Sequence, residues 1–188
     1  MRRSRSWISA NMPIDAGRFR ALFPRLCGSL PDAAVVPLLE SMRPRSFAAG
    51  ERLCTQGEHS ARAIFILRGA VDIQVTAPGV TVTLGTLDAG GWTNSIPLIE
   101  PGPAEFDVVA QTMGAAMEIT YGDLLALRRD HPNTARVFIS GLIADLSHRL
   151  RVSQLAVGTP SAEPRAARQA TGWLSGGTLP GAIVLEGN

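Results

Sequence analysis

Hydrophobic residues recur at helical spacing near the start of the chain. Between Ile14 and Met42 they stand three or four positions apart, as one face of an α-helix requires, at Phe19, Leu22, Phe23, Leu26, Val35, Leu38, Leu39 and Met42. Pro24, Gly28 and Pro31 interrupt this pattern, and proline and glycine both break helices. We therefore predict short helices over residues 14–45, after a basic N-terminal arm over residues 1–13.

The hydrophobic period changes to two between residues 46 and 120. Val71, Ile73 and Val75 alternate with polar residues, and residues 80–84 repeat the alternation. Successive strand residues point to opposite faces, so this pattern indicates strands with one face toward a core and one toward water. Glycines divide the segment at the spacing expected of short strands, at positions 50, 57, 69, 79, 85, 90, 91 and 114. We predict an antiparallel β-roll, a double-stranded jelly roll.

Helical spacing returns over residues 121–157. A short helix is expected to end before Pro132, because the residue that precedes a proline is disfavoured in the α region. A longer helix follows, and its hydrophobic residues form one stripe that must be buried: Phe138, Ile139, Leu142, Ile143, Leu146 and Leu150. The expected fold class is α+β, with one domain over residues 14–157.

Residues 158–188 are rich in glycine, proline, alanine and serine and show no sustained period. This composition is typical of a flexible tail. Two short hydrophobic segments interrupt it, at residues 173–174 and 183–185. They either contact the roll or a partner, or they are disordered with the rest of the tail.

The composition fits one domain with tails. Of the 188 residues, 45% are hydrophobic and 18% are charged, as in globular proteins. The formal net charge is +2, and Arg2, Arg3 and Arg5 contribute to it from the N-terminal arm. The domain itself therefore has no strong field for nucleic acid. The sequence leaves open whether the protein starts at Met1 or at Met12.

The cysteines and the hydropathy indicate a cytoplasmic protein. Cys27 and Cys54 lie far apart, without the spacing of a disulfide framework or a zinc site, so both are expected to be free thiols in a reducing compartment. No hydrophobic stretch follows Arg2 and Arg3 as an export signal requires, and no run is long enough to span a membrane. We therefore expect no membrane association.

Two segments carry a family resemblance. Residues 47–58 read Phe-Ala-Ala-Gly-Glu-Arg-Leu-Cys-Thr-Gln-Gly-Glu, and residues 64–73 read Ile-Phe-Ile-Leu-Arg-Gly-Ala-Val-Asp-Ile. Together they resemble the opening of cyclic nucleotide-binding domains, and the resemblance continues to about Val152. Gly50, Gly57 and Gly69 stand where the strands of such a roll turn sharply and where a positive φ costs glycine little. The resemblance implies a regulatory β-roll of the cAMP receptor protein type.

In this family a short helical loop, the phosphate-binding cassette, follows the stretch that corresponds to residues 84–90. It usually reads Phe-Gly-Glu-x-Ala-Leu and then Pro-Arg-Ala-Ala/Ser-Thr-Val. Residues 93–108 align to it without a gap, as Thr-Asn-Ser-Ile-Pro-Leu-Ile-Glu-Pro-Gly-Pro-Ala-Glu-Phe-Asp-Val. By this resemblance, Ser95 replaces the glutamate that binds the ribose 2′-hydroxyl, and Ala104 replaces the arginine that pairs with the cyclic phosphate.

These replacements are expected to weaken nucleotide binding. Hydrogen bonds to a charged group contribute about 1.5 to 3 kcal/mol each, so losing both contacts costs roughly a hundredfold to ten-thousandfold in affinity. Glu105 and Asp107 add negative charge near the phosphate position, and we expect no compensation from Arg62 or Arg68. A cyclic nucleotide thus remains the candidate cofactor, bound weakly or not at all, and the candidate pocket comprises Thr93, Asn94, Ser95, Ile96, Ala104, Glu105 and Phe106.

The polar run at residues 93–95 has two interpretations. Its hydroxyl and amide groups suit a neutral or differently shaped small molecule. The same residue types routinely cap helices. Both interpretations stay open.

Other chemistries find no support in the sequence. Metal-binding jelly rolls need several histidines in one barrel, and only His59 lies within the predicted roll. The chain has no Gly-x-Ser-x-Gly, P-loop or dinucleotide-binding motif. We predict neither a catalytic site nor a metal site. The glycines and prolines after Val152 leave no room for a helix-turn-helix, so we do not expect this chain alone to bind DNA specifically.

The stripe of the long helix has two possible partners. In regulators that it resembles, this helix packs against its twin in a dimer, which would use Phe138, Leu142, Leu146 and Leu150. Alternatively, the stripe packs on the chain's own roll. Three functions remain: a non-catalytic regulatory module with a protein partner, a genuine small-molecule sensor, and a transcriptional co-regulator that acts with a separate DNA-binding protein.

Overall fold

The computed structural model describes residues 14–27 and 30–157. The predicted basic arm and the predicted flexible tail lie outside these residues. So do the side chains of residues 149–150 and 152–157, which include Leu150. No described helix is long and hydrophobic enough to span a membrane.

Helices gather at both ends of the domain's sequence, and strands lie between them. The helices are α1 (Ala16–Leu22), α2 (Pro24–Cys27), α3 (Asp32–Glu40), α4 (Ser95–Ile99), α5 (Tyr121–Asp130) and α6 (Pro132–Val157). The strands are β1 (Arg43–Phe47), β2 (Arg52–Cys54), β3 (His59–Ser60), β4 (Arg62–Arg68), β5 (Val71–Ala77), β6 (Val80–Leu87), β7 (Trp92–Thr93), β8 (Gly102–Pro103), β9 (Asp107–Ala110) and β10 (Gly114–Thr120).

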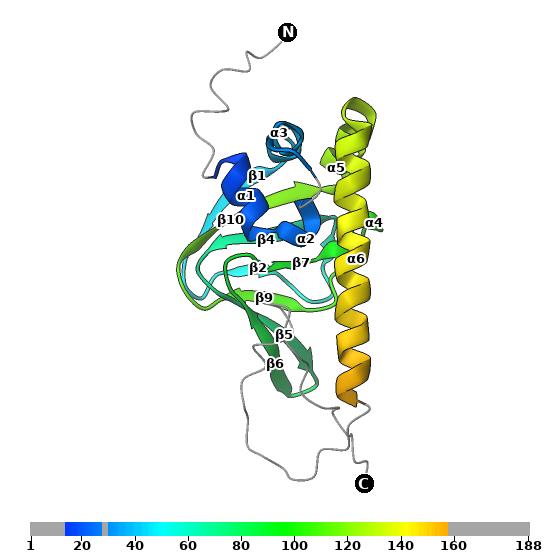
Figure 1. The fold of residues 1–188 in the computed structure, drawn as a ribbon. Coiled ribbons are helices and arrows are strands. Elements are labelled where there is room, and N and C mark those ends of the chain that lie inside the picture. The colour runs from blue at the N-terminus through cyan, green and yellow to red at the C-terminus, as the bar shows by residue number, and fades with distance from the viewer. Residues whose placement is uncertain (1–13, 28–29, 158–188) are drawn as a thin grey trace.

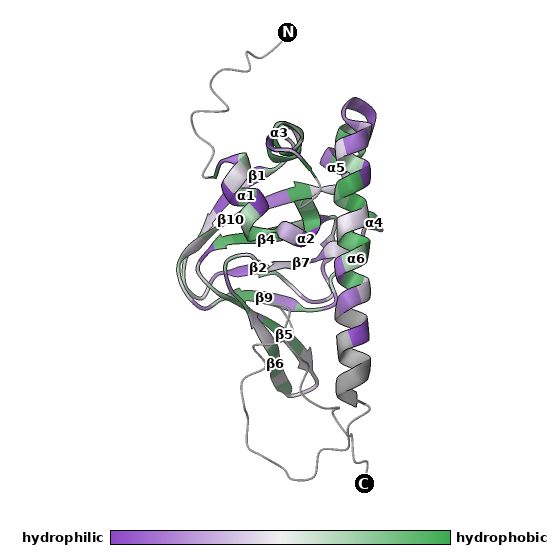
Figure 2. Cartoon of the chain, viewed as in Figure 1, coloured by the Kyte–Doolittle hydropathy of each residue, from purple (hydrophilic) through white to green (hydrophobic). Residues whose placement is uncertain are grey.

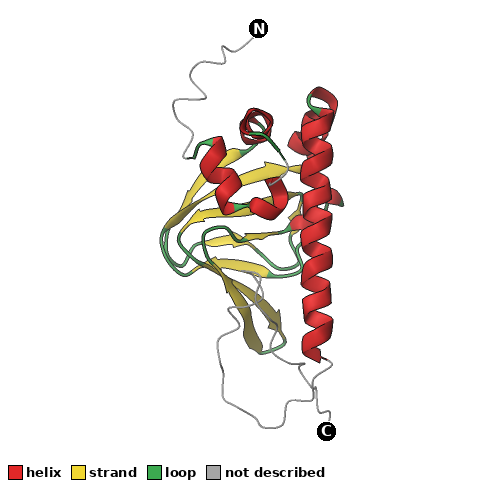
Figure 3. Ribbon diagram, in the orientation of Figure 1, coloured by secondary structure: helices red, strands yellow, loops and turns green. Residues whose placement is uncertain are grey.

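The strands form two antiparallel four-stranded sheets that face each other as a roll. One sheet has the order β1-β10-β4-β7 and the other the order β2-β9-β5-β6, while β3 and β8 make a separate pair. The helices collect on one side of the roll, and α6 runs along the domain beside it (Figures 1 and 3). The predicted α+β fold, an antiparallel roll with short N-terminal helices and a long C-terminal helix, is confirmed.

Strand β4 separates two hydrophobic cores. Ala63 and Phe65 face the helices, whereas Ile64 and Ile66 face the second sheet. All four are fully buried, which explains why this strand is continuously hydrophobic rather than alternating. Figure 2 shows the hydrophobic residues along the central strands of both sheets.

Aromatic rings fill the core between the first sheet and the helices. The Phe65 ring stacks on Trp92 of β7 at a centroid distance of 5.9 Å and meets Phe23 edge-on at 5.5 Å. Phe19 of α1 and Phe138 of α6 complete the cluster, with centroids 6.2 and 6.0 Å from that of Phe65. This cluster joins elements from both ends of the chain.

Helices α2 and α6 approach each other closely at Gly141. A Cβ atom at this position would lie 2.8 Å from the Cα and carbonyl oxygen of Leu26 and 2.9 Å from the carbonyl oxygen of Arg25. One turn later, the buried Asp145 accepts a hydrogen bond from the Arg25 guanidinium at 3.4 Å. Glycine is therefore required here for space and not for backbone freedom.

The predicted hydrophobic stripe of α6 is buried within the chain only in part. Phe138 and Leu142 are fully buried in the helix-side core, and Leu146 packs against it partly buried. Ile143 is 53% exposed on the outer side of the helix. Two of the four residues that we expected in a dimer interface thus belong to the protein's own core, because α2 and the first sheet cover them.

Two strands differ from the sequence pattern. Strand β1 begins at Arg43, earlier than the predicted start at residue 46, because Arg43–Phe47 pairs along its length with β10. In the β5–β6 hairpin, Val80 and Val82 are 59% and 42% exposed. The alternation in β6 correctly indicates a strand, but its valines lie at the tip of the hairpin beyond the second core.

Gly141→Ala is expected to destabilise the domain by about 1 to 3 kcal/mol, because the new methyl group would overlap the α2 backbone. The higher helix propensity of alanine, about 1 kcal/mol, offsets only part of this loss. Chemical denaturation measures the change. The matched control is Gly122→Ala in α5, where the nearest atom to an added Cβ is the Thr120 Oγ1 at 3.8 Å. An equal stability for both variants would contradict the close contact.

Candidate functional site

The segment β7-α4-β8 forms the predicted cassette, and Asn94 sets its entry. Asn94 precedes α4 with φ 60° and ψ 38°, in the left-handed region. Asparagine tolerates this region better than most residues, so it fits where the resemblance places glycine. Its side chain makes no capping hydrogen bond. The amide Nδ2 instead donates to the Cys54 Sγ at 3.0 Å.

The structure separates the predicted pocket residues into three environments. Thr93, Asn94 and Ser95 are buried at the entry of α4, and Ala104 is buried in the core between the sheets. Phe106 packs partly buried against that same core. Ile96 is 48% exposed, and Glu105 is exposed as well.

Ala104, at the position of the family's phosphate-binding arginine, is held by its backbone. Its N–H donates to the Glu58 carbonyl oxygen, and its carbonyl oxygen accepts from the Gly57 N–H, both at 2.8 Å. The residue is only 3% exposed and belongs to the hydrophobic core between the sheets. This position therefore contributes a methyl group to the core and no charge.

Asp107 does not direct a free negative charge at the cassette, contrary to our expectation. Its carboxylate forms an ion pair with Arg52 at 2.6 Å and accepts a hydrogen bond from the Gln56 N–H at 2.8 Å. Desolvation alone would raise the pKa of Asp107, but the Gln56 and Arg52 hydrogen bonds outweigh it and the pKa lies below its ordinary value. An ion pair between Asp107 of β9 and Arg52 of β2 therefore links these two strands, and the charge of the aspartate is balanced.

A polar cavity of about 360 Å³ lies beside the start of β4, and the sequence did not predict it. Its walls come from β1 to β4 and the end of β10, at Arg45, Arg52, Leu53, Cys54, Thr55, Glu58, His59, Ser60, Ala61, Arg62 and Thr120. No residue of the segment 93–106 lines it. Arg62 lies on the same inward face of β4 as Ile64 and Ile66. A charged residue at a position that faces the core is the one sequence feature that could have indicated this cavity.

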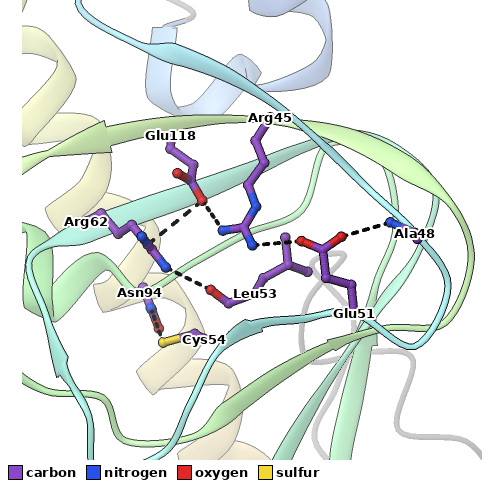
Figure 4. Close-up of polar contacts among 8 residues, drawn as sticks. All are labelled: Arg45, Ala48, Glu51, Leu53, Cys54, Arg62, Asn94 and Glu118. Atoms are coloured by element: carbon purple, nitrogen blue, oxygen red, sulfur yellow. Dashed lines mark hydrogen bonds and ion pairs between the residues drawn. The ribbon is translucent and has the colours of Figure 1, made fainter.

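Arg45, in the wall of this cavity, is paired with two carboxylates (Figure 4). Arg45 donates to Glu118 at 2.8 Å and to Glu51 at 2.9 Å. Desolvation lowers the pKa of Arg45, but these hydrogen bonds outweigh it and the pKa is raised. The hydrogen bonds from Arg45 and from the Ala48 N–H lower the pKa of Glu51.

Arg62 is held less completely than Arg45. Its Nη2 donates to the Leu53 carbonyl oxygen at 2.9 Å. Its Nε lies 3.8 Å from the Glu118 Oε1, which is too long for a hydrogen bond. Cys54 also lines the cavity, and its Sγ accepts from the Asn94 amide (Figure 4), so the wall of the cavity contacts the entry of the cassette.

The cysteines are free and buried. Burial raises the pKa of the Cys27 thiol to about 12, which leaves it without reactive thiolate at neutral pH. Within the described part of the chain, no three histidine, cysteine, aspartate or glutamate residues are grouped to hold a metal ion.

Asp107→Asn is expected to reduce the fall in stability at acid pH. A depressed pKa in the folded state means that the unfolded chain binds a proton first, so the contribution of Asp107 is complete above an ordinary aspartate pKa of about 4 and is lost below it. At neutral pH the variant should lose about 1 to 2 kcal/mol. Urea denaturation between neutral pH and pH 3, roughly one unit below that pKa, measures both effects. Arg52→Gln should give an intermediate profile, and parallel profiles for all three proteins would contradict the role of this carboxylate.

Comparison with known proteins agrees with the geometry of the roll. Residues 44–131 match the cyclic nucleotide-binding domain family. A cyclic nucleotide-gated potassium channel from Rhizobium etli is 30% identical over 106 residues, which are 56% of this chain and 28% of the channel. The chain therefore spans about a quarter of the length of that relative.

Solved structures show the same fold. A cyclic nucleotide-binding domain from Methylobacillus flagellatus KT is 18% identical with a TM-score of 0.66, over 72% of this chain and 80% of that one. The catabolite activator protein of Thermus thermophilus is 25% identical with a TM-score of 0.63, over 70% of this chain and 60% of that one. The N-terminal domain of a transcriptional regulator from Streptomyces coelicolor A3(2) is 22% identical with a TM-score of 0.61, over 73% of this chain and 96% of that one. The roll with its flanking helices therefore has the cyclic nucleotide-binding domain fold, and residues 44–131 are similar in sequence to that family.

Proposed function

We propose that this chain is a non-catalytic regulatory module whose cassette binds cAMP and cGMP weakly or not at all. The observation that carries the proposal is Ala104. Its side chain is a methyl group buried in a hydrophobic core, at the position where the family resemblance places the phosphate-binding arginine. A cyclic phosphate there would lose its ionic partner, and hydrogen bonds from a cation are among the strongest that a phosphate makes.

No other described arginine in this region is available to replace the missing one. Arg52 is engaged by Asp107. Arg62 lines the polar cavity, and no residue of the segment 93–106 lines that cavity. Arg68 is exposed at the far end of β4. Ser95, at the position of the ribose-binding glutamate, has a side chain too short to span the same distance.

Calorimetric titration with cAMP and cGMP is expected to show no saturation below millimolar concentration. The double variant Ser95→Glu/Ala104→Arg should bind cAMP about a hundredfold more tightly or better, because it restores two hydrogen bonds to charged groups. The variant Ser95→Gln/Ala104→Met is the matched control, since it adds similar volume without charge. Micromolar binding by the natural sequence would refute the proposal.

We further propose that the module acts as a homodimer through the outer side of α6. A groove of about 560 Å³ runs between α4, α5 and α6, with Ile99, Leu125 and Ile139 in its wall and Arg128 and Arg136 beside them. The exposed Ile143 follows Ile139 by one helical turn. This i, i+4 row is the spacing at which two helices contact each other. A twofold arrangement would place Ile143 of each copy at the groove of the other.

Ile143→Glu is expected to convert the dimer into a monomer in sedimentation analysis without loss of folding, because the side chain is outside the core. Ala144→Glu, at the neighbouring exposed position off this row, should leave the dimer intact. Leu142→Glu should instead unfold the domain, because Leu142 is fully buried. A monomeric natural protein, or an unchanged mass for Ile143→Glu, would refute the dimer. Action with a separate DNA-binding protein stays a prediction.

A further inference from the structure

The polar cavity beside β4 contains hydrogen-bond donors that no described residue satisfies. The hydroxyl of Ser60 is buried and has no hydrogen-bond partner among the described residues, and the same is true of the Arg62 Nε. Ser60 is 7% exposed, and both residues line the cavity. A buried polar group without a hydrogen-bond partner is destabilising, so these donors favour an occupant that accepts from them.

Arg62 is the least compensated of the three arginines that line this cavity. Arg45 has two carboxylate partners within 2.9 Å, and Arg52 has the buried Asp107. The nearest carboxylate oxygen to Arg62 is the Glu118 Oε1 at 3.8 Å. That oxygen already accepts from the Arg45 Nη1 at 2.8 Å. The Arg62 side chain is 39% exposed, so it is open to a ligand as well as charged.

The unsatisfied groups define the chemistry of the occupant. A guanidinium and a hydroxyl both donate to oxygen, and the planar guanidinium fork matches two oxygens of a carboxylate or phosphate. Three arginines and one glutamate, Glu58, line the cavity, which favours an anion over a cation. The volume of about 360 Å³ lies at the lower end of the range for small-molecule sites.

We propose that this cavity is a ligand site for a small molecule that bears an oxyanion, held by Arg62 and Ser60. The site is independent of the cassette, because none of residues 93–106 lines it. The two are nevertheless in contact, since the Cys54 Sγ in the cavity wall accepts a hydrogen bond from the amide of Asn94 at 3.0 Å. A ligand in the cavity would therefore act on the entry of the cassette through this hydrogen bond. The ligand of this module would thus be an anionic metabolite rather than a cyclic nucleotide in the cassette.

Titration of the purified full chain with inorganic phosphate and with citrate tests the site. At least one probe should bind, and Arg62→Gln should weaken that binding by about tenfold to a hundredfold. Ser60→Ala removes one neutral donor and should weaken it severalfold with little risk to folding. Arg68→Gln is the matched control, because Arg68 is an exposed arginine on the same strand. Preference for phosphate or for citrate identifies which oxyanion the site takes.

Cys54 reports where the probe binds. It lines the cavity, whereas Cys27 is fully buried with its pKa raised to about 12. A bound anion should slow the alkylation of Cys54 by iodoacetamide, followed by mass spectrometry, and this protection should be lost in Arg62→Gln. Binding of neither probe, or binding that Arg62→Gln and Ser60→Ala leave unchanged, would overturn the proposal. Tight binding of cAMP that is unaffected in Arg62→Gln would refute the proposed function of the cassette. It would not decide whether the polar cavity binds an oxyanion, which the phosphate and citrate titrations test separately.

Discussion

The packing around Phe65 holds the helices to the roll. This ring lies on the helix side of β4 and contacts aromatic side chains from α1, the α1–α2 junction, β7 and α6. Aromatic pairs of this kind contribute beyond the area that they bury. Trp92, which stacks on Phe65, comes two residues before Asn94 and α4. The entry of the cassette is therefore positioned by the same core that fixes the N-terminal helices.

Much of this fold is predictable because its residues follow simple periods. The alternation in β5 and the helical spacing in α6 both report on one buried face. Strand β1 is less visible, because Arg43-Pro-Arg-Ser-Phe has no alternation of hydrophobic residues and gains its place from pairing with β10. Periodicity also identifies a buried face without naming what covers it. The stripe of α6 was consistent with a second copy, and the structure shows that α2 and the first sheet bury Phe138 and Leu142.

Of the two candidate sites, the sequence indicates the cassette and does not indicate the polar cavity. Alignment to a family pattern singles out Ser95 and Ala104, since each replaces a residue of known role at a fixed spacing. The polar cavity has no such pattern, because its arginines come from β1, β2 and β4, and the partners Glu118 and Asp107 lie on β10 and β9. Asp107 illustrates the limit. In sequence it adds negative charge beside the cassette, and only the fold reveals that Arg52 neutralises it. Charges that compensate across strands are invisible until the register is known.

The absence of a side chain at Gly141 has a mechanical consequence. Backbone touches backbone where α6 crosses α2, and the Arg25–Asp145 pair closes the same crossing one turn along. Close backbone contact of this kind resists sliding of α6 against α2. The Phe19 and Phe23 rings, packed at 4.7 Å, extend the coupling to α1. We therefore expect a displacement of the long helix to carry α2 and α1 with it.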